Sequence, residues 1–238
     1  MIVESLRAVH AIAALLAIAA APQRVALPPG ATAGVTVTNA GSQAVILDAA
    51  SAGYALDLMG RPRFGRPMGT WFRVQPSTVR LRPGGRATLQ VTALRNVGAR
   101  PGDHAAALIL ASRPLLDRTV KVRVRVGVVV VVRTPGRLVR RLSLGSFRPV
   151  RGRHRLVRLV VVNRGNVDQW VGGGQVTVRL LLGGRAVAVL HPPSRRLLPY
   201  THGAFDLHLP WARKSGLRAS VTVASPGAAP LRGVYRLG

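Results

Sequence analysis

The sequence predicts an all-β protein of two tandem β-sandwich domains that follow an N-terminal signal helix. Three observations predict it. Apolar residues alternate with polar ones in short runs, Gly (26) and Pro (17) stand between those runs, and the chain repeats its own pattern once. Its 238 residues are enough for two domains of about 100 residues each. Because only 4% of the residues are aromatic, the cores must consist mainly of Val, Leu, Ala and Ile.

The expected strands follow from a period of two. Val35–Thr38 and Thr88–Thr92 alternate apolar and polar residues, and Val120–Val126 does so over its whole length. Its four valines would share one face and its three cations the other. Turn residues separate the runs, at Pro28–Gly30, Asn39–Gly41, Arg82–Gly85, Pro101–Asp103, Leu182–Gly184 and Ser225–Gly227. Short strands at this spacing are typical of a sandwich.

The first 21 residues have the pattern of a secretory signal. Arg7 precedes an uncharged apolar run, Ala11–Ala21, whose eleven residues are typical of a short helix and fewer than the roughly 20 that span a membrane. Ala17–Ala19 fits a small-residue cleavage site. The alternative is an N-terminal helix that packs on the first domain. We therefore expect a signal peptide over residues 1–21 and an exported protein that is extracellular, at the cell surface or periplasmic.

The chain resembles itself in three places. Val35–Gly41 and Leu159–Gly165 are apolar runs that end in Asn-x-Gly, with asparagines 124 positions apart (163 − 39). Two strand–turn–strand units contain Leu81–Pro83 and Leu197–Pro199, with prolines 116 positions apart (199 − 83). A third pair of turns has its glycines, at 102 and 216, 114 positions apart (216 − 102). The common order predicts a duplicated domain.

We expect domain 1 at residues 22–127 and domain 2 at residues 128–238. The boundary near Gly127 follows the alternating segment and precedes the continuous apolar run Val128–Val132. Such a run is typical of a strand buried on both faces or of a segment where two domains meet.

The chain has 35 basic and 7 acidic residues, a formal charge of +28. Two interpretations stay open. The charge attracts a polyanion, or it reflects a GC-rich codon bias, which explains arginine over lysine but not the shortage of acids. In the first case we expect a surface that contacts an anionic cell wall or membrane. Its candidate residues are Lys121, Arg123, Arg125, Arg140, Arg141, Arg151, Arg153 and Arg155.

The sequence offers little material for catalysis. Its carboxylates are widely spaced, and it has no Cys for a thiolate metal site. Asp206 and His208 would share one strand face, but no third metal ligand is suggested. We expect no enzymatic activity, no cofactor, no metal and no small-molecule substrate. Nucleic-acid binding, a third interpretation of the charge, is disfavoured by the few aromatic residues and by the export signal.

The pattern of strands and turns resembles the bacterial immunoglobulin-like proteins related to pilus periplasmic chaperones, including Gram-positive cell-surface relatives. The resemblance spans roughly residues 24–236 and implies an immunoglobulin-like sandwich for each domain. The segments that carry it are Pro29–Gly30, Val37–Asn39, Trp71–Pro76, Leu81–Gly85, Pro101–His104 and Val162–Asn166.

In pilus chaperones the last strand of the first domain donates alternating apolar residues to an incomplete pilus subunit. The resemblance implies this role for Val120, Val122, Val124 and Val126, and the alternative is an ordinary core-facing strand. That family also anchors the C-terminal carboxylate of the subunit with an Arg and a Lys. Arg24 lies near the corresponding end of the first strand.

We therefore expect a non-enzymatic, exported cell-envelope protein with a structural, adhesive or interaction role, which contacts anionic surfaces through arginines. The alternative is a chaperone-like assembly factor that donates the Val120–Val126 strand to an envelope protein by strand addition.

Overall fold

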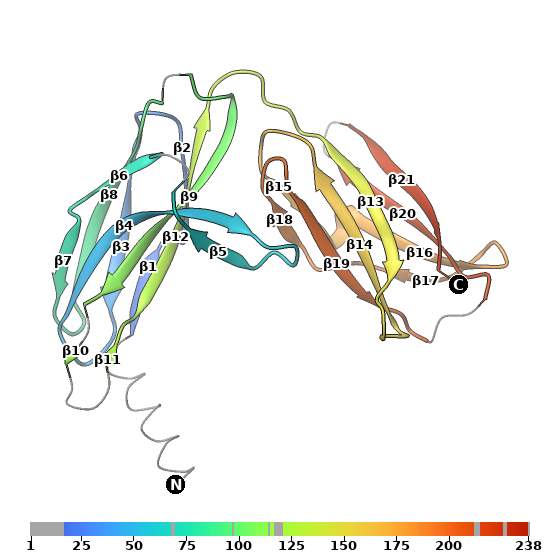
Figure 1. The fold of residues 1–238 in the computed structure, drawn as a ribbon, viewed down its shortest axis with the longest axis horizontal. Helices are drawn as coiled ribbons and strands as arrows, with labels where there is room; N and C mark the ends of the chain where they lie inside the picture. Colours follow the sequence, from blue (N-terminus) through green and yellow to red (C-terminus); the bar gives the residue numbers. More distant parts are fainter. Residues whose placement is uncertain are drawn as a thin grey trace, which may run out of the picture. The chain divides into compact units, whose positions relative to one another are not determined.

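The structure is a computed structural model that describes residues 17–67, 70–96, 98–113, 115–116, 121–211, 215–225 and 228–237. These residues form β-strands and one 3-10 turn, Gly173–Gln175, so the expected all-β class is confirmed (Figure 1). Within the described ranges, no helix has both the length and the apolar character needed to cross a membrane. Most of the helix expected over residues 1–21 lies outside these ranges.

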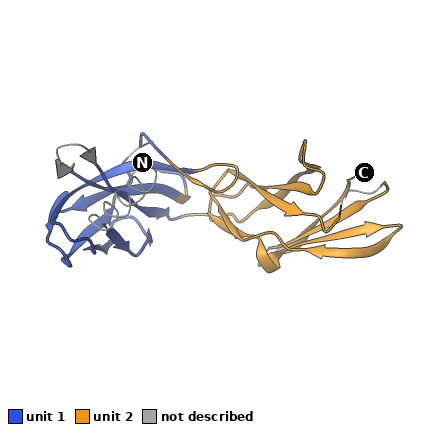
Figure 2. Ribbon diagram, turned by 90° about the horizontal axis from the view of Figure 1, so that it is seen from below, with its two compact units in different colours: residues 1–55, 64–100, 104–135 blue, residues 56–63, 101–103, 136–238 orange. Residues whose placement is uncertain are grey.

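The chain forms two compact units, each with its own hydrophobic core (Figure 2). Unit 1 contains the described residues up to 55 together with 64–100 and 104–135. Unit 2 contains 56–63, 101–103 and the described residues from 136 onward. The chain leaves unit 1 after Pro135 and not near Gly127, because Val128–Val132 lies inside a core strand of unit 1. That each unit folds alone as a domain stays a prediction.

Unit 1 is a sandwich of two sheets, which we name 1A and 1B. Sheet 1A, in spatial order, consists of β1 (Ile18–Ala21), β3 (Thr32–Asn39), β8 (Arg86–Ala93) and β6 (Phe72–Gln75). Sheet 1B consists of β2 (Arg24–Leu27), β12 (Arg125–Thr134), β9 (Gly102–Ser112), β4 (Val45–Leu56) and β5 (Pro62–Gly65), with β7 (Thr78–Leu81) also paired to β4. A separate small hairpin consists of β10 (Leu115–Leu116) and β11 (Lys121–Val122).

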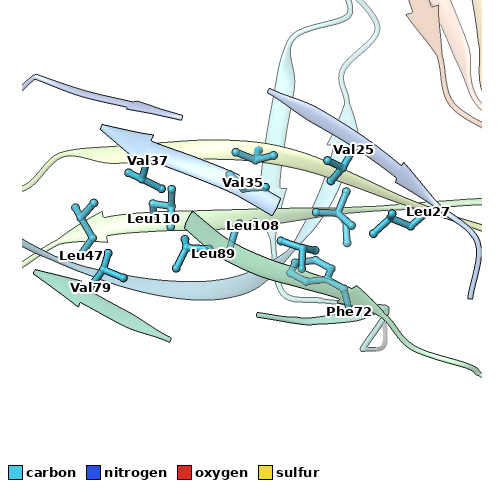
Figure 3. Close-up of a cluster of buried hydrophobic side chains, with 14 of the residues drawn as sticks. Val25, Leu27, Val35, Val37, Leu47, Phe72, Val79, Leu89, Leu108 and Leu110 are labelled. Carbon is cyan, nitrogen blue, oxygen red and sulfur yellow. The ribbon is translucent and has the colours of Figure 1, made fainter. Parts of the chain in front are cut away.

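The core of unit 1 lies between these sheets (Figure 3). Val35 and Leu89 contribute from sheet 1A, and Leu108 and Leu110 contribute from sheet 1B, all of them fully buried. In β3 and β8, buried and more exposed residues alternate because a pleated strand turns every second side chain inward, whereas β9 has buried residues on both faces. The period-two burial predicted from the sequence is therefore present.

The end of the expected signal segment belongs to the fold of unit 1. Ile18–Ala21 forms β1 and pairs antiparallel with β3, from Ile18↔Asn39 to Ala21↔Thr36. Ile18 and Ala20 pack against the core. The prediction of a signal over all of residues 1–21 is corrected here, because cleavage after Ala19 would remove half of a core-packed strand. The sequence concealed β1, since small apolar residues suit a signal helix and a strand equally.

Unit 2 also contains two main sheets, which we name 2A and 2B. Sheet 2A consists of β13 (Leu142–Pro149), β14 (Leu156–Asn163) and β19 (His202–His208). Sheet 2B consists of β17 (Arg185–Leu190), β16 (Val176–Leu182), β20 (Arg218–Ser225) and β21 (Ala228–Arg236). A further pair is formed by β15 (Gln169–Val171) and β18 (Arg195–Leu197). Leu159 of sheet 2A and Val178 of sheet 2B are fully buried in a common core.

The two units repeat one strand pairing in the same register. In unit 1, β3 pairs with β8 from Thr32↔Thr92 to Thr38↔Arg86. In unit 2, β14 pairs with β19 from Leu156↔His208 to Val162↔His202. Adding 124 to the residue numbers of β3 and 116 to those of β8 gives the pairs of β14 and β19. These are the offsets found in the sequence. The duplication is therefore present in the sheets.

Each repeat ends in a buried asparagine that ties the strand pair to a turn. The Nδ2 atom of Asn39 lies 3.3 and 3.2 Å from the carbonyl oxygens of Leu81–Arg82, and Nδ2 of Asn163 lies 3.2 and 3.0 Å from those of Leu197–Leu198. Each Oδ1 atom accepts the N–H of the glycine two residues later, at 3.0 Å. Both asparagines are 0% exposed. The amide thus satisfies backbone groups that have no ladder partner.

The turn beside this amide has a left-handed residue in both units. Gly84 has a φ of 70° in unit 1, and Tyr200, which lies 116 positions later (200 − 84), has a φ of 58° in unit 2. Glycine adopts this conformation without steric cost, whereas a Cβ atom meets the neighbouring backbone there. The turn in unit 2 therefore keeps its shape with a strained residue.

We predict that Asn39→Ala and Asn163→Ala each lower the free energy of unfolding by about 2–4 kcal/mol, because each removes several hydrogen bonds between a fully buried amide and the backbone. Urea unfolding measures the loss. Gln90→Ala, which removes an exposed amide from β8, serves as the control and should change the stability by less than about 0.5 kcal/mol. Equal effects of the buried and the exposed amide would contradict the role assigned to the asparagines.

We predict that Tyr200→Gly stabilises the protein by about 1 kcal/mol, because glycine relieves the left-handed strain. The side chain is 70% exposed, so little packing is lost. Gly84→Ala, at the matching position of unit 1, should destabilise by a similar amount. Thermal unfolding of both variants tests the pair, and two shifts of the same sign would refute the argument.

Candidate functional site

The segment expected to donate a strand is divided in the structure. Val120 lies outside the described residues. Val122 belongs to β11 and pairs with Leu115 of β10, whereas Val126 belongs to β12, and Val124 lies between the two strands. The expectation of one continuous strand over Val120–Val126 is therefore corrected. Alternation of apolar and polar residues predicts a side-chain face, but it does not show where a strand is interrupted.

Two valines of this segment, Val124 and Val126, face the core of unit 1. Val124 and Val126 are half-buried and pack against that core. The stripe continues through Val128, Val130 and Val132, which are 0–1% exposed. In sequence this continuation was hidden, because residues 129 and 131 on the opposite face are also valines. Val124 and Val126 are thus the less buried beginning of a row of valines that faces the core and continues to Val132.

The first half of β12 extends beyond its neighbour β2. The two strands pair in parallel only from Val129↔Arg24 onward, and the N–H group of Val129 donates to the carbonyl oxygen of Gln23 at 2.9 Å. Before Gln23 stands Pro22, which has no N–H to continue the ladder. Before Pro22 the chain is β1, which pairs with β3 in sheet 1A. Arg125–Val128 therefore lies at an edge of sheet 1B that β2 does not cover.

The direction of the backbone groups shows which residues form this edge. The N–H group of Val124 donates to Oγ of Ser112, and its carbonyl oxygen accepts the N–H of Ser112, both at 2.9 Å. Val124 thus points toward β9. Because successive residues of a strand point to opposite edges, Arg125 and Gly127 point away from β9, as Val129 does. Their N–H and C=O groups are the ones offered at the edge.

An open hollow of about 290 Å³ lies beside this edge. Phe64 of β5 lies over it and is 53% exposed. A Cβ atom on Gly127 would lie 3.2 Å from the ring of Phe64, so the absence of a side chain at Gly127 leaves room for this ring beside β12. The lining residues are Ala52, Phe64, Gly65, Ile109, Arg125, Val126 and Gly127. Sequence analysis missed the hollow, because its residues come from four strands.

Arg24 lies at the start of β2, and no lysine of the described residues stands opposite it in the strand pairing. Val129 stands opposite Arg24 in the β2–β12 pairing. Of the two lysines in the sequence, Lys121 lies in β11 and Lys214 lies outside the described residues. The strand pairing therefore does not form the Arg–Lys carboxylate anchor at this position.

The predicted basic residues belong to both units, and those of unit 2 lie at the two ends of one strand. Arg123 and Arg125 belong to unit 1 with Lys121, and Nε of Arg123 donates to the carbonyl oxygen of Ser112 at 3.1 Å. In unit 2, β13 separates two groups, and its eight residues span about 26 Å. Arg140 and Arg141 precede β13, and Arg151, Arg153 and Arg155 follow it. Arg155 donates to the carbonyl oxygen of Pro210.

Two carboxylates of unit 2, those of Asp168 and Asp206, each accept hydrogen bonds from an arginine. Asp206 accepts from Nε of Arg158 at 2.6 Å and from its terminal nitrogen at 2.9 Å. These hydrogen bonds from Arg158 hold the pKa of Asp206 below its ordinary value of 3.8, against the opposing effect of burial. Asp168 accepts from Arg196 at 2.9 Å. Among the described residues, no three acidic or histidine side chains gather in an arrangement that would hold a metal ion.

Comparison with known proteins identifies the fold. The sequence matches no protein-family model and no curated protein. The structure is similar to the YadV chaperone, with 12% identity over 92% of this chain and 99% of that chain and a TM-score of 0.52. It is also similar to the class 5 fimbriae chaperone CfaA, with 11% identity over 92% and 98% of the two chains and a TM-score of 0.54.

Two further similar structures contain a chaperone bound to another protein. One is the Salmonella enterica SafA pilin in complex with the SafB chaperone, with 14% identity over 93% and 97% of the two chains and a TM-score of 0.50. The other is the chaperone–tip subunit complex CsuC–CsuE of Acinetobacter baumannii, with 14% identity over 92% and 97% and a TM-score of 0.51. At such identities the likeness shows the fold alone. The fold expected from the resemblance, two immunoglobulin-like sandwiches similar to those of pilus chaperones, is confirmed.

We predict that Asp206→Asn lowers the free energy of unfolding by about 1 kcal/mol at neutral pH, because it weakens a two-point ion pair. The pKa of Asp206 is depressed in the folded state, so its contribution is complete above the unfolded value and is lost as the pH falls through the folded value. The difference between the proteins should therefore vanish well below pH 3.8. Urea unfolding across acidic pH measures it.

The double variant Arg158→Met/Asp206→Asn completes a thermodynamic cycle for this pair. Its coupling energy should be present at neutral pH and absent in acid. A loss of stability in Asp206→Asn that persists unchanged in acid would assign the effect to packing and not to the ion pair.

Proposed function

We propose that the protein is a chaperone-like assembly factor of the cell envelope that binds a partner by strand addition along the first half of β12. One observation carries the proposal: Arg125–Val128 forms an edge of sheet 1B that β2 leaves uncovered. An uncovered edge offers N–H and C=O groups to an added strand. The fold supports it, because similar structures contain a chaperone with a pilin or with a tip subunit.

In strand addition at this edge, backbone hydrogen bonds to β12 would provide affinity, and side-chain contacts on the two faces of sheet 1B would provide specificity. The groups of Arg125 and Gly127 would bond to a strand about 4.8 Å away. On the inner face, the half-buried Val124 and Val126 would be covered further by apolar residues of the partner. On the outer face, a partner side chain would enter the hollow beside Phe64. The partner is therefore an envelope protein with an incomplete sheet.

The proposed location follows from the N-terminus and from the fold. Residues before Ile18 keep the apolar pattern of a signal, which would direct the chain out of the cytoplasm. An assembly factor of this kind would act in the periplasm or at the outer side of the membrane. The proposal contains no chemical step and needs no cofactor, because the contacts are backbone hydrogen bonds and apolar packing.

We predict that Arg125→Pro abolishes partner capture, because proline removes the N–H group that points to the uncovered edge. Arg125→Ala is the matched control. It removes the same charge but keeps the N–H, and should retain capture within about threefold. Envelope subunits encoded beside this chain are produced with it, each without its own N-terminal segment, and co-purification is quantified.

The stability of the variants keeps this test interpretable. Because the N–H of Arg125 points away from β9, Arg125→Pro should unfold within about 1 kcal/mol of the unaltered protein. Capture by Arg125→Pro at the unaltered level would refute strand addition at this edge. A second result would also refute it: the unaltered chain captures no neighbouring subunit, and the N–H groups of Arg125 and Gly127 exchange slowly in the free protein. Slow exchange would mean that these groups are already hydrogen-bonded and not available to a partner.

A further inference from the structure

The outer face of sheet 2B combines arginines with exposed valines. In β16 and β20 the residues Val178, Leu180 and Val221 turn inward and are fully buried, so the residues between them face outward. Val189 and Val234 are 51% and 67% exposed. We name this surface the basic face. It consists of Arg179, Val189, Arg218, Arg232, Val234 and Arg236, all exposed.

The strand register brings these residues together. Val189 pairs with Arg179, Arg179 with Ser220, and Ser220 with Val234, so one row crosses all four strands. In the neighbouring rows, Arg218 pairs with Arg236 and Thr222 pairs with Arg232. Rows are about 7 Å apart and strands about 4.8 Å apart, so the face measures roughly 15 Å in each direction. Figure 1 shows the four strands side by side.

The basic face has no acidic residue of its own. The sequences of β16, β17, β20 and β21 contain no Asp or Glu. Elsewhere in unit 2 arginines are neutralised, as Arg158 is by Asp206 and Arg196 by Asp168. Among the described residues, none of the four arginines of the basic face takes part in such an ion pair. No described carboxylate therefore neutralises their positive charge.

We propose that the basic face binds the surface of an anionic phospholipid membrane. The face is formed by one sheet, so its arginines meet a plane of headgroups at one depth. Positive side chains close to an anionic leaflet add to the attraction, and apolar side chains between them are buried among the headgroups. Val189 and Val234 occupy such positions, between Arg179, Arg232 and Arg236.

A soluble polyanion is the other partner that such charge would attract, and the valines distinguish the two. A flexible polymer binds through counterion release and gains little from exposed valines. Single-stranded nucleic acid also gains from aromatic side chains on which bases stack. The basic face contains none, since Tyr235 of β21 turns inward against Phe147. The combination of arginine and exposed valine on one face favours the membrane surface.

The test is co-sedimentation of the full chain with vesicles of phosphatidylcholine, with and without phosphatidylglycerol. We expect binding only to the anionic vesicles, and weaker binding as salt rises. The variant Arg179→Ser/Arg232→Ser/Arg236→Ser should lose on the order of 100-fold in affinity, about fivefold per arginine. The matched control Arg73→Ser/Arg80→Ser/Arg86→Ser removes the same charge from exposed sites in unit 1, and should lose less than about threefold.

A second variant and a competitor identify the partner. Val189→Ser/Val234→Ser should weaken vesicle binding about tenfold but leave the binding of soluble polyphosphate unchanged. Equal losses in the two arginine variants would overturn the proposal, because net charge alone would then explain binding. So would the absence of binding to anionic vesicles, or a valine variant that binds them as the unaltered protein does. Partner capture through β12 should be unchanged in all three variants, so this proposal and the proposed function fail separately.

Discussion

The fold depends on a buried amide that connects a strand pair to a turn. Asn39 in unit 1 and Asn163 in unit 2 satisfy backbone carbonyls that the sheets leave without partners, in a place that water does not reach. Hydrogen bonds of a fully buried amide are costly to lose, so each amide stabilises the junction between its strand pair and the turn. Its repetition with the same register makes the second unit a copy of the first in physical terms. The turn at Tyr200 has the same left-handed conformation as the turn at Gly84, although its residue carries a Cβ atom.

The proposed site follows from a change of sheet near the N-terminus. The first strand begins in sheet 1A as β1 and continues in sheet 1B as β2, with Pro22 between them. A strand divided in this way can cover only part of its neighbour. The half of β12 that it leaves uncovered carries the edge, the half-buried valines and the hollow beside Phe64. Because the chain changes sheets at Pro22, backbone groups and apolar side chains of β12 are left where a partner strand could bind them.

Electrostatics divides the surface of unit 2 into neutral and charged regions. With so few carboxylates, each aspartate that pairs with an arginine neutralises one site and leaves the remaining arginines unbalanced. Asp206 and Asp168 neutralise Arg158 and Arg196, whereas sheet 2B has no acid at all. The net charge of +28 therefore has a spatial pattern that composition does not contain. Of the predicted basic residues, Lys121, Arg123 and Arg125 belong to unit 1, and those of unit 2 lie at the two ends of β13.

The sequence by itself determined the all-β class, the inward-facing valines and the duplication, because each is a local pattern that a strand converts directly into a face. It also pointed to Asn39 and Asn163, whose neighbouring glycines mark a turn. Only the tertiary structure decided that Ile18–Ala21 is a strand, that Val128–Val132 belongs to unit 1 and that Val120–Val126 is interrupted. These features depend on which strand is the neighbour in space, and pairing between distant residues leaves no period in the chain. The edge of β12 and the basic face also depend on which strands become neighbours in space. The edge exists because β2 does not pair with Arg125–Val128, and the basic face exists because four strands pair side by side.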